Sequence, residues 1–276
     1  MGLFREPERL FVCTPSRLGA YEECPRRYRF TYVDRPAPPK GPPWAHNSLG
    51  ASTHTALRAW FDLPPARRRP DQLAGLLRAT WVSDGYRDGA QEREVFERAL
   101  DWLHRYVREL EPDFEPLAVE RTVAMKTPAL AFSGRVDRID EVAGGELVIV
   151  DYKTGRSELD SDDARGSRAL ALYAVATERM FRRRCRRVEL HHLPTGTVAA
   201  HEHSEESLGR HLRRAEQTAA DIVAAGKDVA AGADPDEAFP TTPGSICGWC
   251  DYRRVCPAGS ARPGNESWTA VERAAA

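Results

Sequence analysis

The chain has 276 residues, of which 41% are hydrophobic and 29% are charged, and its net charge is −1 at pH 7. This composition predicts a soluble protein with a sizeable core and gives no overall basic signal for nucleic acid. No apolar run approaches the roughly 18 to 20 residues that a membrane span needs. The opening stretch MGLFREPERLF lacks the apolar centre of a signal peptide, so we expect a cytoplasmic protein without membrane contact.

The first part of the chain predicts helices separated by prolines. Thr14-Pro15-Ser16 is typical of a helix start, and Cys24-Pro25 should break that helix. A proline-rich linker follows over 34–44. Further helices are expected in NSLGASTHTALRAWF, over 71–82 and over 91–110.

From about residue 117 the pattern changes to strands, in LAVERTVAM, ALAFSGRVDRIDEV and ELVIVDYKT. A helix is expected in SRALALYAVATERMF, a hairpin in VELHHL and TVAAHEH, and a long helix from about 204 to 226. The predicted units are an N-terminal segment over 1–43, a helical region over 44–116, an α/β core over 117–226, and a linker, cysteine cluster and tail over 227–276.

The hairpin GRVDRIDEVAGGELVIVDYKTG brings acidic residues together. If its loop is Ala143-Gly144-Gly145, counting back along both strands places Asp137 opposite Asp151, and directly opposed side chains have Cβ atoms about 4.5 to 5.5 Å apart. Strand alternation puts Lys153 on the same face as Asp151. A loop of two residues would instead send Asp137 to the other face.

Two carboxylates beside a lysine suit metal-assisted hydrolysis. Mg²⁺ and Mn²⁺ prefer oxygen ligands, and such an ion polarises a phosphodiester and lowers the pKa of a bound water. The alternative is a surface ladder of charges. The apolar run LVIV before Asp151 favours the catalytic interpretation, because it is typical of a strand buried on both faces.

GRVDRID followed by VIVDYKTG resembles the paired motifs of the PD-(D/E)XK nuclease superfamily, in its RecB-like exonuclease branch. The resemblance implies a restriction-endonuclease-like fold, a central mixed sheet flanked by helices. It implies that Asp137 and Asp151 bind the metal and that Lys153 is the catalytic lysine. Gly50, His54 and Leu57 match the branch's G-x-x-x-H-x-x-L pattern, so His54 is expected to be a further metal ligand.

The branch also carries a Q-x-x-x-Y motif on the helix after the second acidic strand. Tyr173 matches the tyrosine and is expected at the site, whereas Ala169 stands where the family has glutamine. Glu120 lies where many relatives carry an acid, and a solvated strand residue is the alternative for it.

Three cysteines lie close together in CGWCDYRRVCP, at Cys247, Cys250 and Cys256. A structural metal site usually needs four ligands, and thiolates suit both zinc and iron–sulfur clusters. SRLGAYEECPRRY resembles the start of an iron–sulfur subgroup of RecB-like nucleases. The resemblance implies that Cys24 is the fourth ligand of a 4Fe–4S cluster, with zinc as the alternative, and the isolated Cys13 and Cys185 are interpreted as incidental.

The sequence therefore predicts a Mg²⁺- or Mn²⁺-dependent deoxyribonuclease, a single-strand exonuclease of DNA repair or recombination. The motifs are similar to those of the AddB nuclease domain and of CRISPR adaptation nucleases. The alternatives are a CRISPR adaptation nuclease and a non-catalytic DNA-binding module on the same fold. DNA is the expected partner, together with a helicase, repair or CRISPR protein. The arginines of 179–187 and 210–214 predict a solvated helix face or, alternatively, a phosphate-tracking groove.

Overall fold

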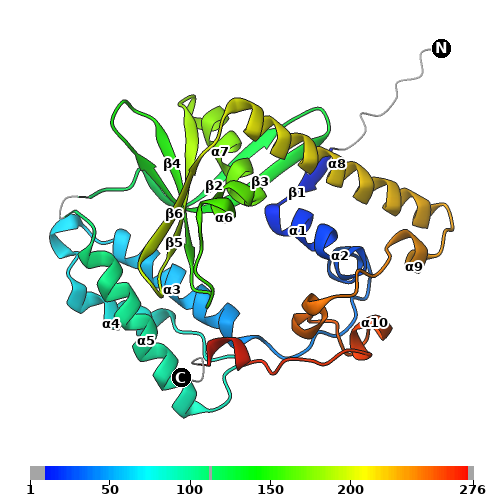
Figure 1. Ribbon diagram of the computed structural model, residues 1–276, viewed down its shortest axis with the longest axis horizontal. Helices are drawn as coiled ribbons and strands as arrows, with labels where there is room; N and C mark the ends of the chain where they lie inside the picture. The colour runs from blue at the N-terminus through cyan, green and yellow to red at the C-terminus, as the bar shows by residue number, and fades with distance from the viewer. Residues whose placement is uncertain (1–9, 112–113, 273–276) are drawn as a thin grey trace.

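A mixed six-stranded sheet forms the centre of the computed structural model, which describes residues 10–111 and 114–272 (Figure 1). The spatial order is β1-β3-β4-β5-β6, and β2 pairs with β3 outside this path. Two parallel pairs, β1 with β3 and β4 with β5, make the sheet mixed. The strands are β1 (Phe11–Cys13), β2 (Ala118–Lys126), β3 (Leu130–Glu141), β4 (Leu147–Lys153), β5 (Cys185–His192) and β6 (Thr197–Glu202).

Helices flank the sheet, and several begin at residues whose side chains accept hydrogen bonds from the first backbone N–H groups of the helix. Asp88 caps one helix by accepting hydrogen bonds from the backbone N–H groups of Ala90 and Gln91. The helices are α1 (Pro15–Glu23), α2 (Pro25–Tyr32), α3 (Ala45–Phe61), α4 (Leu73–Thr80), α5 (Gly89–Arg108), α6 (Ser161–Gly166), α7 (Arg168–Phe181), α8 (Glu205–Ala230), α9 (Pro235–Ala238) and α10 (Pro257–Ser260). Short 3-10 helices are η1 (Pro65–Arg67), η2 (Pro70–Gln72), η3 (Ser245–Trp249) and η4 (Thr269–Val271).

Strand β4 is buried on both faces and separates two hydrophobic cores. Leu147 and Ile149 belong to the core that includes α1, α2, α7 and α8. Val148 and Val150 alternate with them and belong to the core that includes α3, α4 and α5. The predicted double burial of LVIV is therefore confirmed, and so is the expected α/β fold with a central mixed sheet flanked by helices.

The predicted register of the β3–β4 hairpin is also confirmed. Arg138 pairs with Val150, Glu141 pairs with Leu147, and the Val142 N–H donates to the Glu146 carbonyl across the turn. Gly144 and Gly145 both have positive φ, at 87° and 81°, which a turn of this kind needs. One step beyond the Arg138–Val150 pair, Asp137 lies opposite Asp151.

The arginine-rich segment after α7 differs from the predicted helix face. Helix α7 ends at Phe181, Arg182 adopts a left-handed conformation, and Arg186 and Arg187 lie within β5. Buried Cys185, Val188 and Leu190 draw this segment into the sheet, so burial of the apolar residues outweighs the charge run.

Among the described residues, no helix is long and apolar enough to cross a membrane.

Candidate active site

Three carboxylates form a row across three neighbouring strands. Asp137 lies in the middle on β3, with Asp151 opposite it on β4. On the other side, Val119 pairs with Arg138 and Arg121 pairs with Val136, which places Glu120 opposite Asp137 on β2. Opposed side chains of a sheet are close enough to share a cation, so the strand register itself assembles an acidic site.

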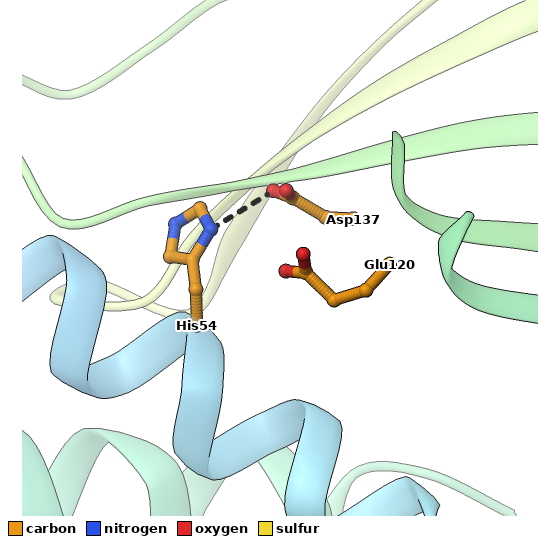
Figure 2. Close-up of side chains that lie close together, drawn as sticks. All are labelled: His54, Glu120 and Asp137. Atoms are coloured by element: carbon orange, nitrogen blue, oxygen red, sulfur yellow. Dashed lines mark ion pairs between the residues drawn. The ribbon is translucent and has the colours of Figure 1, made fainter. Parts of the chain in front are cut away.

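His54 approaches this row from α3 (Figure 2). Its Nδ1 lies 3.3 Å from Oδ2 of Asp137, and ligand atoms of His54, Glu120 and Asp137 all lie within 4.8 Å of one another. The other nitrogen, Nε2, is 3.1 Å from the Tyr152 carbonyl, which can only accept. A hydrogen bond from Nε2–H leaves the Nδ1 lone pair facing the acids, and metal-ligating histidines typically have this backbone partner.

Burial and mutual repulsion act on the acids of the row. Burial raises the pKa of Glu120, Arg135 opposes this, and Asp137 reinforces it. Burial likewise raises the pKa of Asp151. The charge of Lys153 lowers this pKa, and the charge of Asp137 raises it further. Both groups thus resist ionisation as long as no cation offsets the neighbouring charge. An imidazole and carboxylates around one point fit a hard divalent cation.

The second acid carries the predicted lysine beside it. Nζ of Lys153 lies 2.5 Å from Oδ2 of Asp151, and the lysine side chain is 44% exposed. Strand alternation places the two on one face of β4, as the sequence predicts. The Asp137 carboxylate is fixed separately, because the Tyr152 backbone N–H donates to its Oδ2 over 2.9 Å.

Tyr173 reaches the same site from α7. A Cβ atom added to Gly134 would lie only 2.4 Å from Cε1 of Tyr173, so the tyrosine ring packs directly on the glycine of GRVD. Burial, with Asp151 and Asp137 adding to it, raises the pKa of Tyr173 to about 12. The hydroxyl therefore keeps its proton at neutral pH. Ala169 lies one turn earlier on α7, and its side chain lacks the amide of the glutamine expected at this position.

Apart from Asp151, which does not line it, these groups open into a cleft of 1110 Å³. His54, Glu120, Asp137, Lys153 and Tyr173 all line it. So do two arginines that sequence analysis did not single out, Arg58 and Arg135, whose cationic groups suit a phosphate-bearing ligand. Arg135 binds Glu120 through Nε and Oε2, 2.6 Å apart. Counting the register across the β2–β3 hairpin, as across the next one, would have placed Glu120 in the row.

The four cysteines assigned to a cluster line a separate cavity. Cys24 lies at the junction of α1 and α2, and Cys247, Cys250 and Cys256 lie in and around η3 and before α10. Among the described residues, ligand groups within 4.8 Å of one another include no three of these sulfur atoms. Cys13 and Cys185 are fully buried in the core around α7, as expected of residues without a ligand role.

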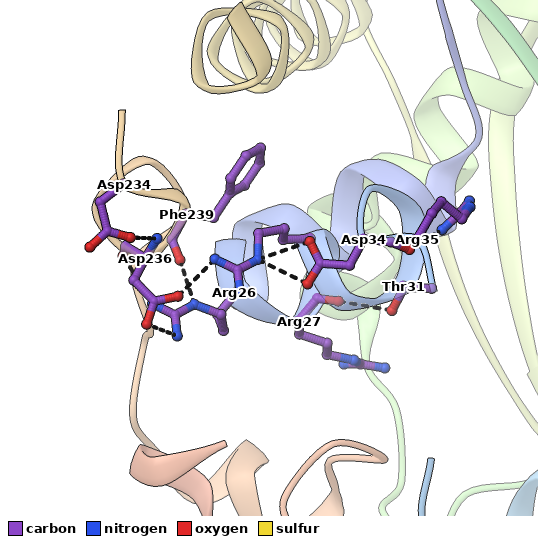
Figure 3. A network of polar contacts seen from close by, with 9 residues as sticks. Arg26, Arg27, Thr31, Asp34, Arg35, Asp234, Asp236 and Phe239 are labelled. Atoms are coloured by element: carbon purple, nitrogen blue, oxygen red, sulfur yellow. Dashed lines mark hydrogen bonds and ion pairs between the residues drawn. The ribbon is translucent and has the colours of Figure 1, made fainter. Parts of the chain in front are cut away.

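A charged contact holds the two sides of the cysteine cavity together (Figure 3). Arg26 of α2 donates to the Phe239 carbonyl over 2.9 Å and pairs with the Asp236 carboxylate at 2.9 Å. Arg29 pairs with the same carboxylate and with Asp34. The bonds to Asp236 and Phe239 join residues more than 200 positions apart and hold α2 beside the segment around α9 (Figure 1). The Thr242 backbone N–H lies 3.5 Å from Sγ of Cys24.

The arginine-rich segments pair largely with nearby acids. Arg183 binds Glu141 and Arg187 binds Glu189. The second segment behaves similarly, since Arg210 pairs with Glu206 in the next turn of α8. Within the described part of the chain, the residues lining the active-site cleft come from neither segment. Both segments thus lie outside the cleft, the first partly in β5 and the second on α8.

Comparison with known proteins identifies the family of this chain. A family model described as the PD-(D/E)XK nuclease superfamily matches residues 12–257. A solved structure of a candidate exonuclease from Eubacterium rectale has a TM-score of 0.50 and 11% identity, covering 88% of each chain. That of SSO0001 has a TM-score of 0.42 and 14% identity, covering 92% of this chain and 89% of the other. No curated protein matches. The chain belongs to the PD-(D/E)XK nuclease superfamily.

Proposed function

We propose that the protein is a divalent-metal-dependent deoxyribonuclease that acts on single strands from their ends, in DNA repair or recombination. The observation that carries this proposal is the group His54, Glu120 and Asp137, which lines one open cleft together with Lys153, the partner of Asp151. Family membership implies hydrolysis of DNA and use of a divalent metal. The RecB-like branch rests on the order of motifs around His54, Asp137, Asp151 and Tyr173.

His54, Asp137 and Asp151 would hold Mg²⁺ or Mn²⁺, and Glu120 joins them as a fourth group. The bound ion supplies polarisation of the phosphodiester and a lower pKa for water at the site. Lys153 extends its ammonium group into the cleft, where it can orient the attacking water and stabilise negative charge on the phosphate oxygens. Tyr173 holds a proton on its hydroxyl and can donate a hydrogen bond to the same phosphate.

The test compares metal-dependent cleavage by wild type and Asp151→Asn on single- and double-stranded DNA labelled at either end. Removing one metal-binding carboxylate should lower the rate by at least about a hundredfold, the order expected when electrostatic stabilisation of the transition state is lost. Asp162→Asn, on exposed α6, is the control and should cleave like wild type. Metal-dependent cleavage that survives Asp151→Asn would refute the assigned site. Products released from internal positions would refute an exonuclease.

We also propose that Cys24, Cys247, Cys250 and Cys256 bind a 4Fe–4S cluster. All four line one cavity, and thiolates are the ligands such clusters take. Zinc, which four thiolates can also hold, is the alternative. Absorbance and metal content of anaerobically purified protein separate the two.

A further inference from the structure

A second groove of 570 Å³ continues from the active-site cleft. His46, Thr154 and Gly155 line both, so the two hollows meet where β4 ends, immediately after Lys153. A DNA strand bound over Lys153 would therefore have a continuous surface to follow away from the site of cleavage.

Two tryptophans from different elements line this second groove. Trp102 lies on α5, and Trp249 lies in η3 between Cys247 and Cys250. Both are partly exposed. Trp249 packs against the rings of Trp44 and His46, with ring centroids 5.4 and 5.7 Å away. The Arg98 guanidinium lies 5.6 Å from the Trp102 ring centre. Both rings are thus held in place by their neighbours.

The charge of the groove complements a phosphate backbone. Arg156, which follows the strand that carries the catalytic lysine, is exposed and touches the Thr269 carbonyl at 3.4 Å. The acid that lines the groove, Glu272, is paired with Arg87 at 3.0 Å. Arginine beside supported aromatic rings is the combination that binds unstacked bases and their phosphates in single strands.

We propose that this groove binds the single-stranded DNA on one side of the scissile phosphate, with bases stacked on Trp249 and Trp102 and a phosphate on Arg156. The proposal rests on the nuclease function proposed above. Duplex DNA offers no free base faces along its length, so the groove would select strands that are already unpaired.

The test separates binding in the groove from the chemical step. The probes are a 20-residue oligothymidylate and bis(4-nitrophenyl) phosphate, which is too small to reach the groove from the active site. Trp102→Ala and Trp249→Ala should each raise KM for the oligonucleotide about 5- to 140-fold, the range for loss of one stacked base. Their hydrolysis of bis(4-nitrophenyl) phosphate should equal that of wild type. Trp249→Phe keeps a ring and should restore most of the affinity.

A charge substitution provides an independent measurement. Arg156→Ala should reduce the slope of log Kd against log salt by about 0.7, the value for one phosphate contact on a single strand. Arg213→Ala, exposed on α8 away from both hollows, is the matched control and should leave the slope unchanged.

Two results would overturn the inference in distinguishable ways. If wild type cleaves both substrates and both tryptophan variants keep the wild-type KM for the oligonucleotide, the groove does not bind the strand, and the proposed nuclease function stands. If no substrate is cleaved, the nuclease function fails. The groove is then tested by fluorescence anisotropy of the labelled oligonucleotide, and equal dissociation constants for wild type and variants would refute it.

Discussion

At the scale of single residues, Glu120 combines a carboxylate at the candidate metal site with an unfavourable backbone. Its φ of 49° lies in the left-handed region, which costs a non-glycine residue about 1 to 2 kcal/mol. Its carboxylate also faces Asp137 across the sheet, and its pKa is raised. Without a cation, both features destabilise the folded chain, as is common where function and stability conflict.

Glu120→Asn should therefore increase stability while lowering activity. Asparagine tolerates the left-handed region and carries no charge. We expect the free energy of unfolding in a chelator to rise by about 1 kcal/mol and nuclease activity to fall at least tenfold. Thermal unfolding and the end-labelled assay measure the two. Glu158→Asn, in an exposed loop, should change neither, and a Glu120→Asn protein less stable than wild type would contradict the argument.

His54 should make metal binding depend on pH. Burial alone would lower the pKa of His54, but the hydrogen bond and charge of Asp137, with Asp151 and Glu120, outweigh it and raise the pKa above 6.5. A proton then competes with the metal for Nδ1. As pH falls through the raised pKa, the apparent affinity for Mn²⁺ should fall, approaching about tenfold per pH unit.

Calorimetric titration with Mn²⁺ between about pH 6 and pH 9 measures this dependence. His54→Asn binds more weakly but lacks the competing proton, so its affinity should vary less over the same range. If the Mn²⁺ affinity of His54→Asn varies with pH as steeply as that of wild type, the proton that competes with the metal is not on His54.

At the scale of elements, strand β3 needs a glycine where helices α1 and α7 press on it. A Cβ atom on Gly134 would lie 2.4 Å from the Tyr173 ring and 3.2 Å from Cδ of Pro15. The glycine of the GRVD motif, inside β3, therefore leaves the space in which the Tyr173 ring packs. Its role is packing between elements, with no contact of its own to the metal ligands.

Gly134→Ala should displace Tyr173 and destabilise the protein by about 1 to 3 kcal/mol, as overpacking of a core does. Cleavage of DNA should slow together with the loss of stability. In a Tyr173→Ala background the added methyl group has room, so the same substitution should cost less than in wild type. Thermal unfolding measures both losses of stability. If Gly134→Ala destabilises wild type and the Tyr173→Ala protein equally, the added methyl group does not clash with Tyr173.

Elements with strong local signals were predictable, and those fixed by distant contacts were not. The glycine turn after Val142 determined the β3–β4 register, and hence Asp137 opposite Asp151, from local sequence alone. Strand β1 has only three residues and pairs with β3, far along the chain, so no local pattern predicts it. For Glu120 the sequence leaves a catalytic acid and a solvated strand residue as alternatives, because no local pattern signals its left-handed backbone or its place opposite Asp137 across the β2–β3 hairpin.

At the scale of the whole molecule, the two sides of the cysteine cavity come from distant parts of the chain. In the sequence, every strand of the sheet except β1 lies between Cys24 and Cys247. The Arg26–Asp236 pair and the stacked rings of Tyr28 and Phe239, 6.2 Å apart, already join these parts without a cluster. A bound cluster would add a covalent constraint to a contact that the polypeptide makes by itself.

Cys24→Ala should lose iron and lower the unfolding temperature of the anaerobic protein, because cluster binding is coupled to folding. Cys13→Ala is a suitable control, since it removes a fully buried thiol that has no place in the cysteine cavity. It should lower stability by about 1 kcal/mol through a small void and retain its iron. Full iron content with unchanged melting in Cys24→Ala would exclude a cluster ligated by this cysteine.

The contact between Tyr28 and Phe239 also imposes an order on folding during synthesis. Tyr28 is 1% exposed in the folded chain and Phe239 is fully buried, yet about two hundred residues separate them. A ribosome adds roughly 5 to 20 residues per second, so α2 emerges on the order of 10 to 40 s before its partner. During that interval the nascent chain exposes an aromatic surface, and protection by a chaperone would matter most then.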